Sequence, residues 1–171
     1  MTSPSQHPQR RPLSGFTLIE LLVVIAIIAI LAGLGFAGVT GAMKTARKAE
    51  VRAMANQVKL ALTAYYSDYG VWPTNATNTG ANFLNMITGV ATNTGNRRGI
   101  RYLEPAAKFT NGSGLVTPAR FYSVGQSNFS VVVDTNYDGR VRLPGQSADT
   151  PGSVAVWVTD PDSATKYIGT W

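Results

Sequence analysis

Apolar residues are concentrated in one block near the start of the chain, and the pattern changes sharply on either side of it. Residues 1–15 are polar and rich in proline, whereas Leu21–Val39 carries no charged residue. Nineteen residues in an α-helix extend about 28 Å, close to the thickness of the hydrocarbon core of a bilayer. The pattern therefore predicts a leader over residues 1–15 and a transmembrane helix over residues 16–41.

Beyond residue 41 the apolar positions recur every three or four residues, as on one face of an amphipathic helix. That face comprises Val51, Met54, Ala55, Val58, Ala61, Leu62, Tyr65, Tyr66 and Tyr69. Gly70 and Pro73 are expected to end the helix. Because no strong breaker intervenes, one helix of about 50 residues is predicted from Phe16 to near Asp68, with residues 42–70 as its amphipathic continuation. We expect the tyrosines to pack in the core under a sheet; the alternative is that they bind a ligand.

The C-terminal half alternates between apolar and polar positions, which is typical of β-strands. Strands are predicted at residues 121–124, 129–134, 140–143 and 154–158. The second and third of these flank Thr135–Gly139, which suits a hairpin connection. Residues 74–99, rich in Asn, Thr and Gly, predict a loop region around a short helix at Phe83–Ile87. Residues 71–171 are thus expected to form a globular β-rich domain, and the chain an α+β fold in which the long helix packs on a small antiparallel sheet.

The composition argues against catalysis. The sequence has no cysteine and a single histidine, His7, which lies in the predicted leader. Without these two residues a chain lacks the side chains most used in nucleophilic, acid–base and transition-metal chemistry. The nine acidic residues show no obvious catalytic pairing. We therefore do not expect an enzyme.

The formal net charge of +6 is scattered along the chain, which does not favour nucleic acid as a partner. Arg97, Arg98 and Arg101 form one small basic cluster, interpreted as a solvated surface, with DNA or polyanion binding as the alternative. Basic residues stand both before and after the apolar block, so the positive-inside rule does not decide its orientation.

Glu20 lies just inside the apolar block, where an unpaired charge costs about 2–4 kcal/mol at depth and less near the interface. One interpretation is that Glu20 stays wet among lipid headgroups; the other is that it pairs with a cation from another chain. Cleavage between Gly15 and Phe16 would create such a cation, the new α-amino group. Because four residues make about one helical turn, neighbouring helices staggered by one turn would bring the two charges together. Repetition of that register would generate a filament.

A second candidate site is the alternation of Asp134, Asn136 and Asp138, followed by Gly139. This spacing can aim three oxygen ligands at one hard cation, as in the first half of an EF-hand loop, although the closing glutamate has no counterpart. The residues considered for the missing ligands are Asp149, Asp160 and Asp162. The sequence allows weak Ca²⁺ binding or, without a metal, a simple turn between two strands.

The run Gly15-Phe16-Thr17-Leu18-Ile19-Glu20, followed by the apolar residues Leu21–Leu31, closely resembles the class III signal of type IV pilins and type II secretion pseudopilins. The resemblance implies that a prepilin peptidase cuts after Gly15 on the cytoplasmic side and N-methylates Phe16. It places the chain in the bacterial inner membrane as a single-pass protein, with the C-terminal domain periplasmic, and then in a cell-envelope filament. The implied partners are copies of the chain, other pilins or pseudopilins, the inner-membrane assembly platform and membrane lipid.

Two further segments are similar to major pseudopilins: the end of the long helix, from Ala61 to Thr74, and the loop Asp134–Gly139. They imply a structural subunit of a pseudopilus that supports protein secretion. The alternatives are a type IV pilin for adhesion, motility or DNA uptake, and an anchored binding module that does not polymerise. The glycines of the apolar helix suit close helix packing or, as the resemblance suggests, local unwinding on assembly; they are Gly33, Gly35, Gly38 and Gly41.

Overall fold

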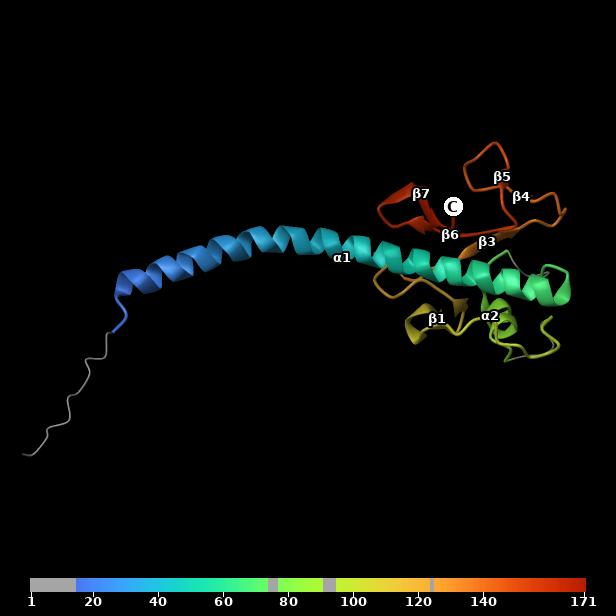
Figure 1. The fold of residues 1–171 in the computed structure, drawn as a ribbon, viewed down its shortest axis with the longest axis horizontal. Helices are drawn as coiled ribbons and strands as arrows, with labels where there is room; N and C mark the ends of the chain where they lie inside the picture. The colour runs from blue at the N-terminus through green and yellow to red at the C-terminus, as the bar shows by residue number, and fades with distance from the viewer. Residues whose placement is uncertain (1–14, 74–76, 91–94, 124) are drawn as a thin grey trace, which may run out of the picture. The chain divides into compact units, whose positions relative to one another are not determined.

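The structure is a computed structural model that describes residues 15–73, 77–90, 95–123 and 125–171, excluding the side chains of residues 34–38. The predicted leader therefore lies outside the described residues, apart from Gly15. The chain divides into two units, Met1–Met43 and Lys44–Trp171. The elements, in chain order, are α1 (Leu18–Tyr69), α2 (Ala81–Ile87), the 3₁₀ helix η2 (Ala107–Phe109), β1 (Thr110–Asn111), β2 (Gly114–Leu115), β3 (Ser130–Val133), β4 (Arg140–Val141), β5 (Thr150–Pro151), β6 (Val154–Asp160) and β7 (Ser163–Gly169) (Figure 1).

Helix α1 contains 52 residues and confirms the prediction of one long helix. It is helical across residues 33–41, where the glycines lie. It ends where predicted: Gly70 adopts φ +69°, and its N–H donates to the Tyr66 carbonyl at 2.8 Å. Glycine takes this left-handed conformation without the steric cost that other residues incur, so the helix ends there.

Among the described residues, no helix combines the length and the apolar character that crossing a membrane requires.

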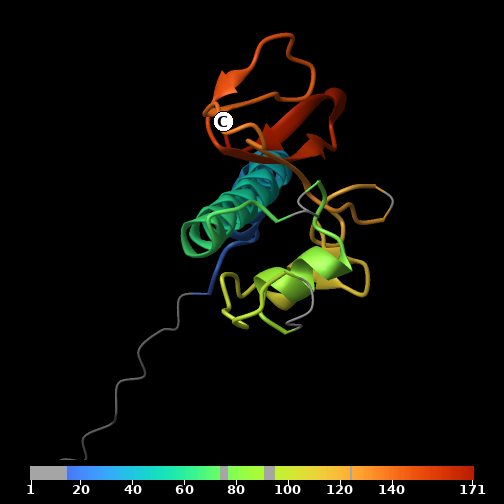
Figure 2. The same ribbon diagram turned by 90° about the vertical axis from the view of Figure 1, so that its right-hand side faces the viewer.

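The core of the unit Lys44–Trp171 forms around the second half of α1. Figures 1 and 2 show this half of the helix between the sheet that contains β3, β6 and β7 on one side and α2 with β1 on the other. The predicted apolar face is confirmed at the residues that become buried, which are Val51, Met54, Ala55, Val58, Ala61, Leu62 and Tyr65. Phe83 of α2 and Phe129, just before β3, join them in one hydrophobic cluster. The helix is therefore covered on two sides within this unit.

The main sheet has the strand order β3-β6-β7, and both pairings are antiparallel. Valines of β3 pair with β6, Val131 opposite Val156 and Val133 opposite Val154. Two small two-stranded sheets, β1-β2 and β4-β5, complete the fold. The fold is α+β, with a long N-terminal helix packed on small antiparallel sheets, as the sequence predicts.

Several details of the predicted β-structure are wrong. The predicted hairpin between residues 129–134 and 140–143 does not form, because β3 pairs with β6 and β4 pairs with β5. The long apolar strand β6 buries the β3 valines more completely than the two-residue strand β4 could. Residues 121–123 form bends rather than a strand, and residue 124 lies outside the described residues. Strand β7, rich in polar residues, was not predicted.

Candidate processing and assembly site

The predicted cleavage site lies in non-helical backbone just before α1. Gly15, Phe16 and Thr17 have no regular secondary structure, and the Phe16 side chain is 83 % exposed. A β-carbon built on Gly15 would meet no atom within 4 Å among the described neighbours. Because a protease must bind its substrate as extended chain, this local structure leaves the Gly15–Phe16 bond open to processing.

Helix α1 begins with a reciprocal cap formed by Thr17 and Glu20. The Thr17 backbone N–H and Oγ1 both donate to Glu20 Oε2 at 2.8 Å. In return, the Glu20 N–H donates to Thr17 Oγ1 at 3.3 Å. This capping box satisfies backbone donors that the first helical turn leaves without partners, and it places a carboxylate at the positive end of the helix dipole.

The capping role of Glu20 was missed from the sequence, although the spacing Thr-x-x-Glu before an apolar run is its usual signal. Within the described part of the chain, both hydrogen bonds that this carboxylate accepts fall on Oε2, and Oε1 accepts none. Gly15, Phe16 and Glu20 are thus brought to one end of the helix. Glu20 can cap its own helix and still offer an oxygen to a cation.

The helix that follows exposes its apolar side chains all round within the first unit. Exposed fractions range from 48 % at Val23 to 82 % at Leu18, and Val39 and Met43 are also more than half exposed. Gly33 and Gly41 have open space where a β-carbon would stand, and the side chains of residues 34–38 lie outside the described set. A contiguous apolar surface of this extent is unusual on a soluble monomer and marks an interaction surface.

The loop from Asp134 to Gly139 is organised by the Asp134 carboxylate. Its Oδ1 accepts from the Asp138 N–H at 3.2 Å and its Oδ2 from the Gly139 N–H at 2.7 Å, and Asp134 is buried. Asp138 Oδ2 accepts from the Asn136 amide at 2.8 Å. The three residues therefore do meet in one loop, but two of them use their oxygens on loop N–H groups. Among the described residues, no group of three or more His, Cys, Asp or Glu side chains is placed to hold a metal ion.

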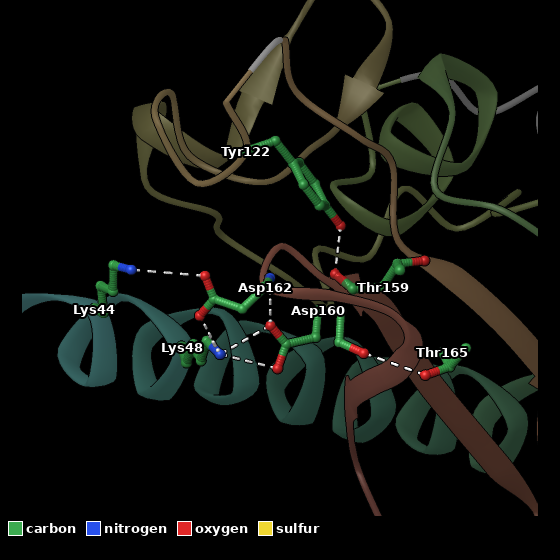
Figure 3. A network of polar contacts seen from close by, with 8 residues as sticks. Lys44, Lys48, Tyr122, Thr159, Asp160, Asp162 and Thr165 are labelled. Atoms are coloured by element: carbon green, nitrogen blue, oxygen red, sulfur yellow. Dashed lines mark hydrogen bonds and ion pairs between the residues drawn. The ribbon is translucent and has the colours of Figure 1, made fainter. Parts of the chain in front are cut away.

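The carboxylates considered as further calcium ligands have other partners. Asp160 and Asp162 bind Lys48, and Asp149 accepts from Arg142 Nε at 2.8 Å. Figure 3 shows Lys44 and Lys48 on α1 reaching the turn between β6 and β7, where Asp160 and Asp162 lie. This ionic contact was not predicted, because nothing local in the sequence relates residues so far apart.

Tyr65 is buried in the core, as expected, and Tyr69 packs against it, whereas Tyr66 is half-buried and stacks on Trp72. The Tyr65 and Tyr69 rings stack at 4.5 Å, and Tyr69 Oη donates to the buried Asn96 side chain at 3.0 Å. The basic cluster is exposed: Arg98 lies over the Tyr69 ring at 5.7 Å, and Arg101 lies 3.4 Å from Glu104. These contacts agree with the solvated-surface interpretation.

A long N-terminal helix that packs on small antiparallel sheets, preceded by the exposed non-helical residues Gly15–Thr17, defines a pilin-like α+β class. Residues 10–36 match the family model described as the prokaryotic N-terminal methylation motif. The chain carries a prepilin-type signal of the type IV pilin and pseudopilin kind, which implies processing by a prepilin peptidase and assembly with other pilins. Searches of the curated proteins and of the solved structures found no match.

Proposed function

We propose that the mature chain is a structural, non-catalytic subunit of a pilus-like filament, and that this filament is a type II secretion pseudopilus. A prepilin peptidase cuts after Gly15 and methylates the new amino group of Phe16. The chain then stands in the inner membrane with its C-terminal domain in the periplasm, until the assembly platform adds it to the filament. The observation that carries the proposal is the exposed apolar surface of the first half of α1, most of which lies within the methylation motif.

In this proposal the apolar helix has two successive environments, the lipid bilayer before assembly and the helices of neighbouring subunits afterwards. Both remove its side chains from water, at about 25 cal/mol per Å² of apolar surface buried. Covering residues such as Ile25 and Leu31, each exposed by more than half, therefore favours both environments over exposure to water. The step from bilayer to filament depends instead on helix packing and polar contacts, because lipid is as apolar as the helix. Burial of apolar surface is not directional and does not by itself choose an axial register.

We propose that Glu20 sets the axial register between neighbouring helices. Cleavage gives Phe16 a free amino group, which carries a positive charge. Glu20 Oε2 caps its own helix, and Oε1 accepts from the Phe16 amine of the adjacent subunit. In an apolar surrounding an unpaired carboxylate is costly, so only the staggered register is favourable.

The capping box permits a sharper test of this pairing than truncation of Glu20. Glu20→Gln keeps an acceptor for the Thr17 cap but removes the negative charge, whereas Thr17→Ala removes the two hydroxyl bonds of the cap and keeps the charge. We expect Glu20→Gln to be cleaved and inserted but not incorporated into filaments, and Thr17→Ala to be incorporated. Mass spectrometry of the N-terminus measures cleavage and methylation, and sheared-filament fractions measure incorporation.

Two results would refute the proposal. A protein purified from its host that still begins at Met1 would exclude processing, and normal incorporation of Glu20→Gln would exclude the charge pair. A type IV pilin for adhesion, motility or DNA uptake is separated from a pseudopilin by its genetic setting: secretion ATPase and secretin genes favour the latter. A non-polymerising anchored module would show cleavage without filaments in the wild-type chain.

We propose that calcium binds the Asp134–Gly139 loop only weakly. The oxygen donors Asp134, Asn136 and Asp138 suit a hard cation, but Ca²⁺ takes six to eight oxygen ligands and would compete with the N–H groups that Asp134 already binds. Calorimetry with millimolar calcium, compared with Asp138→Asn, tests this. No heat and no thermal shift would leave the loop as a structural turn.

A further inference from the structure

A basic cavity of about 220 Å³ lies in the unit Lys44–Trp171, and the proposed function does not use it. Its wall is formed by the start of this unit's part of α1, the bends after residue 118 and the turn between β6 and β7. The side chains that define it here are Lys44, Arg47, Lys48, Arg120, Tyr122 and Asp162. The volume is below the roughly 300–1,000 Å³ of pockets for drug-sized ligands, which favours a small polar group.

The charges around the basic cavity do not balance. Lys48 Nζ lies 2.8 Å from both Asp160 and Asp162, so its charge is compensated (Figure 3). Lys44 reaches only the already shared Asp162, at 3.8 Å. Arg47 and Arg120 form no ion pair with any residue in the part of the chain that the structure describes. Two solvent-exposed arginines therefore line the cavity without a counter-charge.

One of these arginines is held in a strained backbone conformation. Arg120 has φ +67°, in the left-handed region that side chains other than glycine rarely adopt. Among the described residues, all other positions with positive φ are glycines, apart from Tyr137. A glycine would relieve the strain at Arg120, yet the chain has an arginine at this point in the cavity wall. Backbone strain of this kind clusters at ligand-binding and active sites.

Hydrogen bonds and core packing hold the cavity wall beside Arg120 in place. Phe121 is buried in the core, and Tyr122 Oη donates to the Thr159 carbonyl at 2.7 Å, which ties the bends to β6 (Figure 3). The Asp162 N–H donates to Asp160 Oδ1 at 2.9 Å, which holds the opposite turn. The basic groups are therefore presented by fixed backbone on three sides rather than by a loose loop.

We propose that the basic cavity binds the phosphate group of an anionic phosphate ester. Arginine presents several N–H donors in a planar fork that matches two phosphate oxygens, and lysine adds a compact positive charge. Arg47 and Arg120 take the phosphate oxygens, while Lys44 contributes charge. The bound phosphate group belongs either to an anionic phospholipid headgroup or to a free phosphate ester. The lipid source rests on the proposed function, because Lys44 directly follows the uncharged residues 21–43 that are proposed to enter the membrane.

The test uses the mature chain, residues 16–171, in a neutral detergent. Isothermal titration calorimetry measures binding of glycerol 3-phosphate and of short-chain phosphatidylglycerol, with short-chain phosphatidylcholine as the zwitterionic comparison. The cavity variants are Arg120→Gly and the double variant Arg47→Gln/Arg120→Gln. The matched control is Arg97→Gln/Arg140→Gln, which removes the same charge from exposed positions outside the cavity.

We expect both cavity variants to weaken glycerol 3-phosphate binding by about tenfold or more, which corresponds to the loss of one charge-assisted contact. The control is expected to change it by less than about twofold. Arg120→Gly carries a second readout: it lowers affinity while its melting temperature stays equal or rises, because glycine relieves the φ strain. A folding defect would instead lower both the affinity for glycerol 3-phosphate and the melting temperature.

A lipid headgroup and a free phosphate ester give different results in these titrations. Loss of phosphatidylglycerol binding in the cavity variants, with weak phosphatidylcholine binding throughout, supports the lipid headgroup; loss for glycerol 3-phosphate alone supports a free ester. Absence of binding by the wild-type chain, or equal losses in the control, would overturn the proposal. Processing and filament incorporation are measured separately, so failure of the filament proposal does not produce either of these results.

Discussion

Lys48 of α1 and Asp160 at the end of β6 form an ion pair at 2.8 Å although they are 112 positions apart in the sequence. Both side chains are largely shielded, with 30 % of Lys48 and 13 % of Asp160 exposed. The same Nζ lies 2.8 Å from Asp162. One lysine therefore holds the turn between β6 and β7 against helix α1.

Loss of this ion pair should lower the stability of the unit. Lys48→Met keeps most of the aliphatic stem but leaves Asp160 without its cation and Asp162 with only the more distant Lys44, so we expect a measurable loss in the free energy of unfolding. Urea denaturation of the detergent-solubilised mature chain measures it through tryptophan fluorescence, since all three tryptophans lie in this unit.

The control is Arg101→Met, which breaks the exposed pair with Glu104. Exposed pairs contribute little, so the expected loss is below about 0.5 kcal/mol. Similar losses in the two variants would show that the Lys48 contact adds no more than an ordinary surface pair.

The same contact predicts that stability falls in acid. Partial burial acts to raise the pKa of Asp160, but the hydrogen bonds from Lys48 and from the Asp162 N–H outweigh it, and the pKa is lowered. The hydrogen bond from Lys48 also lowers the pKa of Asp162. The unfolded chain therefore binds these protons more readily, so the stabilisation is complete above the unfolded pKa of about 4 and is lost as the pH falls below it toward the folded values.

Melting temperatures between about pH 5 and pH 2.5 check this dependence. Asp160→Asn removes one of the titrating groups, so its melting temperature should be lower at pH 5 and should decline less on acidification. An unchanged slope in Asp160→Asn would indicate that other carboxyl groups control the acid sensitivity.

Asn96 is a second point on which the unit depends. It is fully buried, and its amide donates to the carbonyls of Met86 and Ile100 at 2.8 and 2.6 Å. Its Oδ1 accepts from Tyr69 Oη at 3.0 Å and from the Ile100 N–H at 3.1 Å. Asn96→Leu leaves these buried groups without partners, and we expect a loss of about 2–4 kcal/mol. Asn82→Leu on the exposed side of α2 is the control, with an expected change in the free energy of unfolding within about 0.5 kcal/mol. Equal losses of stability in the two variants would contradict the role given to the Asn96 hydrogen bonds.

Gly114 of β2 allows a close backbone approach that no other residue permits. Its φ is +125°, and a β-carbon there would lie 2.3 Å from the Gly80 carbonyl carbon and 2.4 Å from the Thr79 oxygen. Gly114→Ala should therefore displace the start of α2 and cost about 3 kcal/mol or more. Gly112, two residues earlier, has open space at the β-carbon, so Gly112→Ala should cost less than about 1 kcal/mol. Denaturation of the matched pair measures the difference, and a tolerated Gly114→Ala would refute the packing argument.

The sequence by itself determined the features that depend on nearby residues. The methylation motif, the extent of α1, its buried face and its end at Gly70 all follow from spacing within a few residues, because helical periodicity and capping are local. The Thr17–Glu20 capping box belongs to this class too, since its signal was present within four residues of sequence although it was overlooked.

Only the tertiary structure decided which strands pair and which charges meet. The Asp134–Gly139 loop was expected to join two paired strands, but burial of the β3 valines is satisfied better by β6, from 20 or more residues away. The Lys48–Asp160 pair and the strained Arg120 beside it likewise have no local signal. Strand pairing and long-range ion pairs depend on how distant segments pack against one another. The local pattern of residues therefore does not predict them.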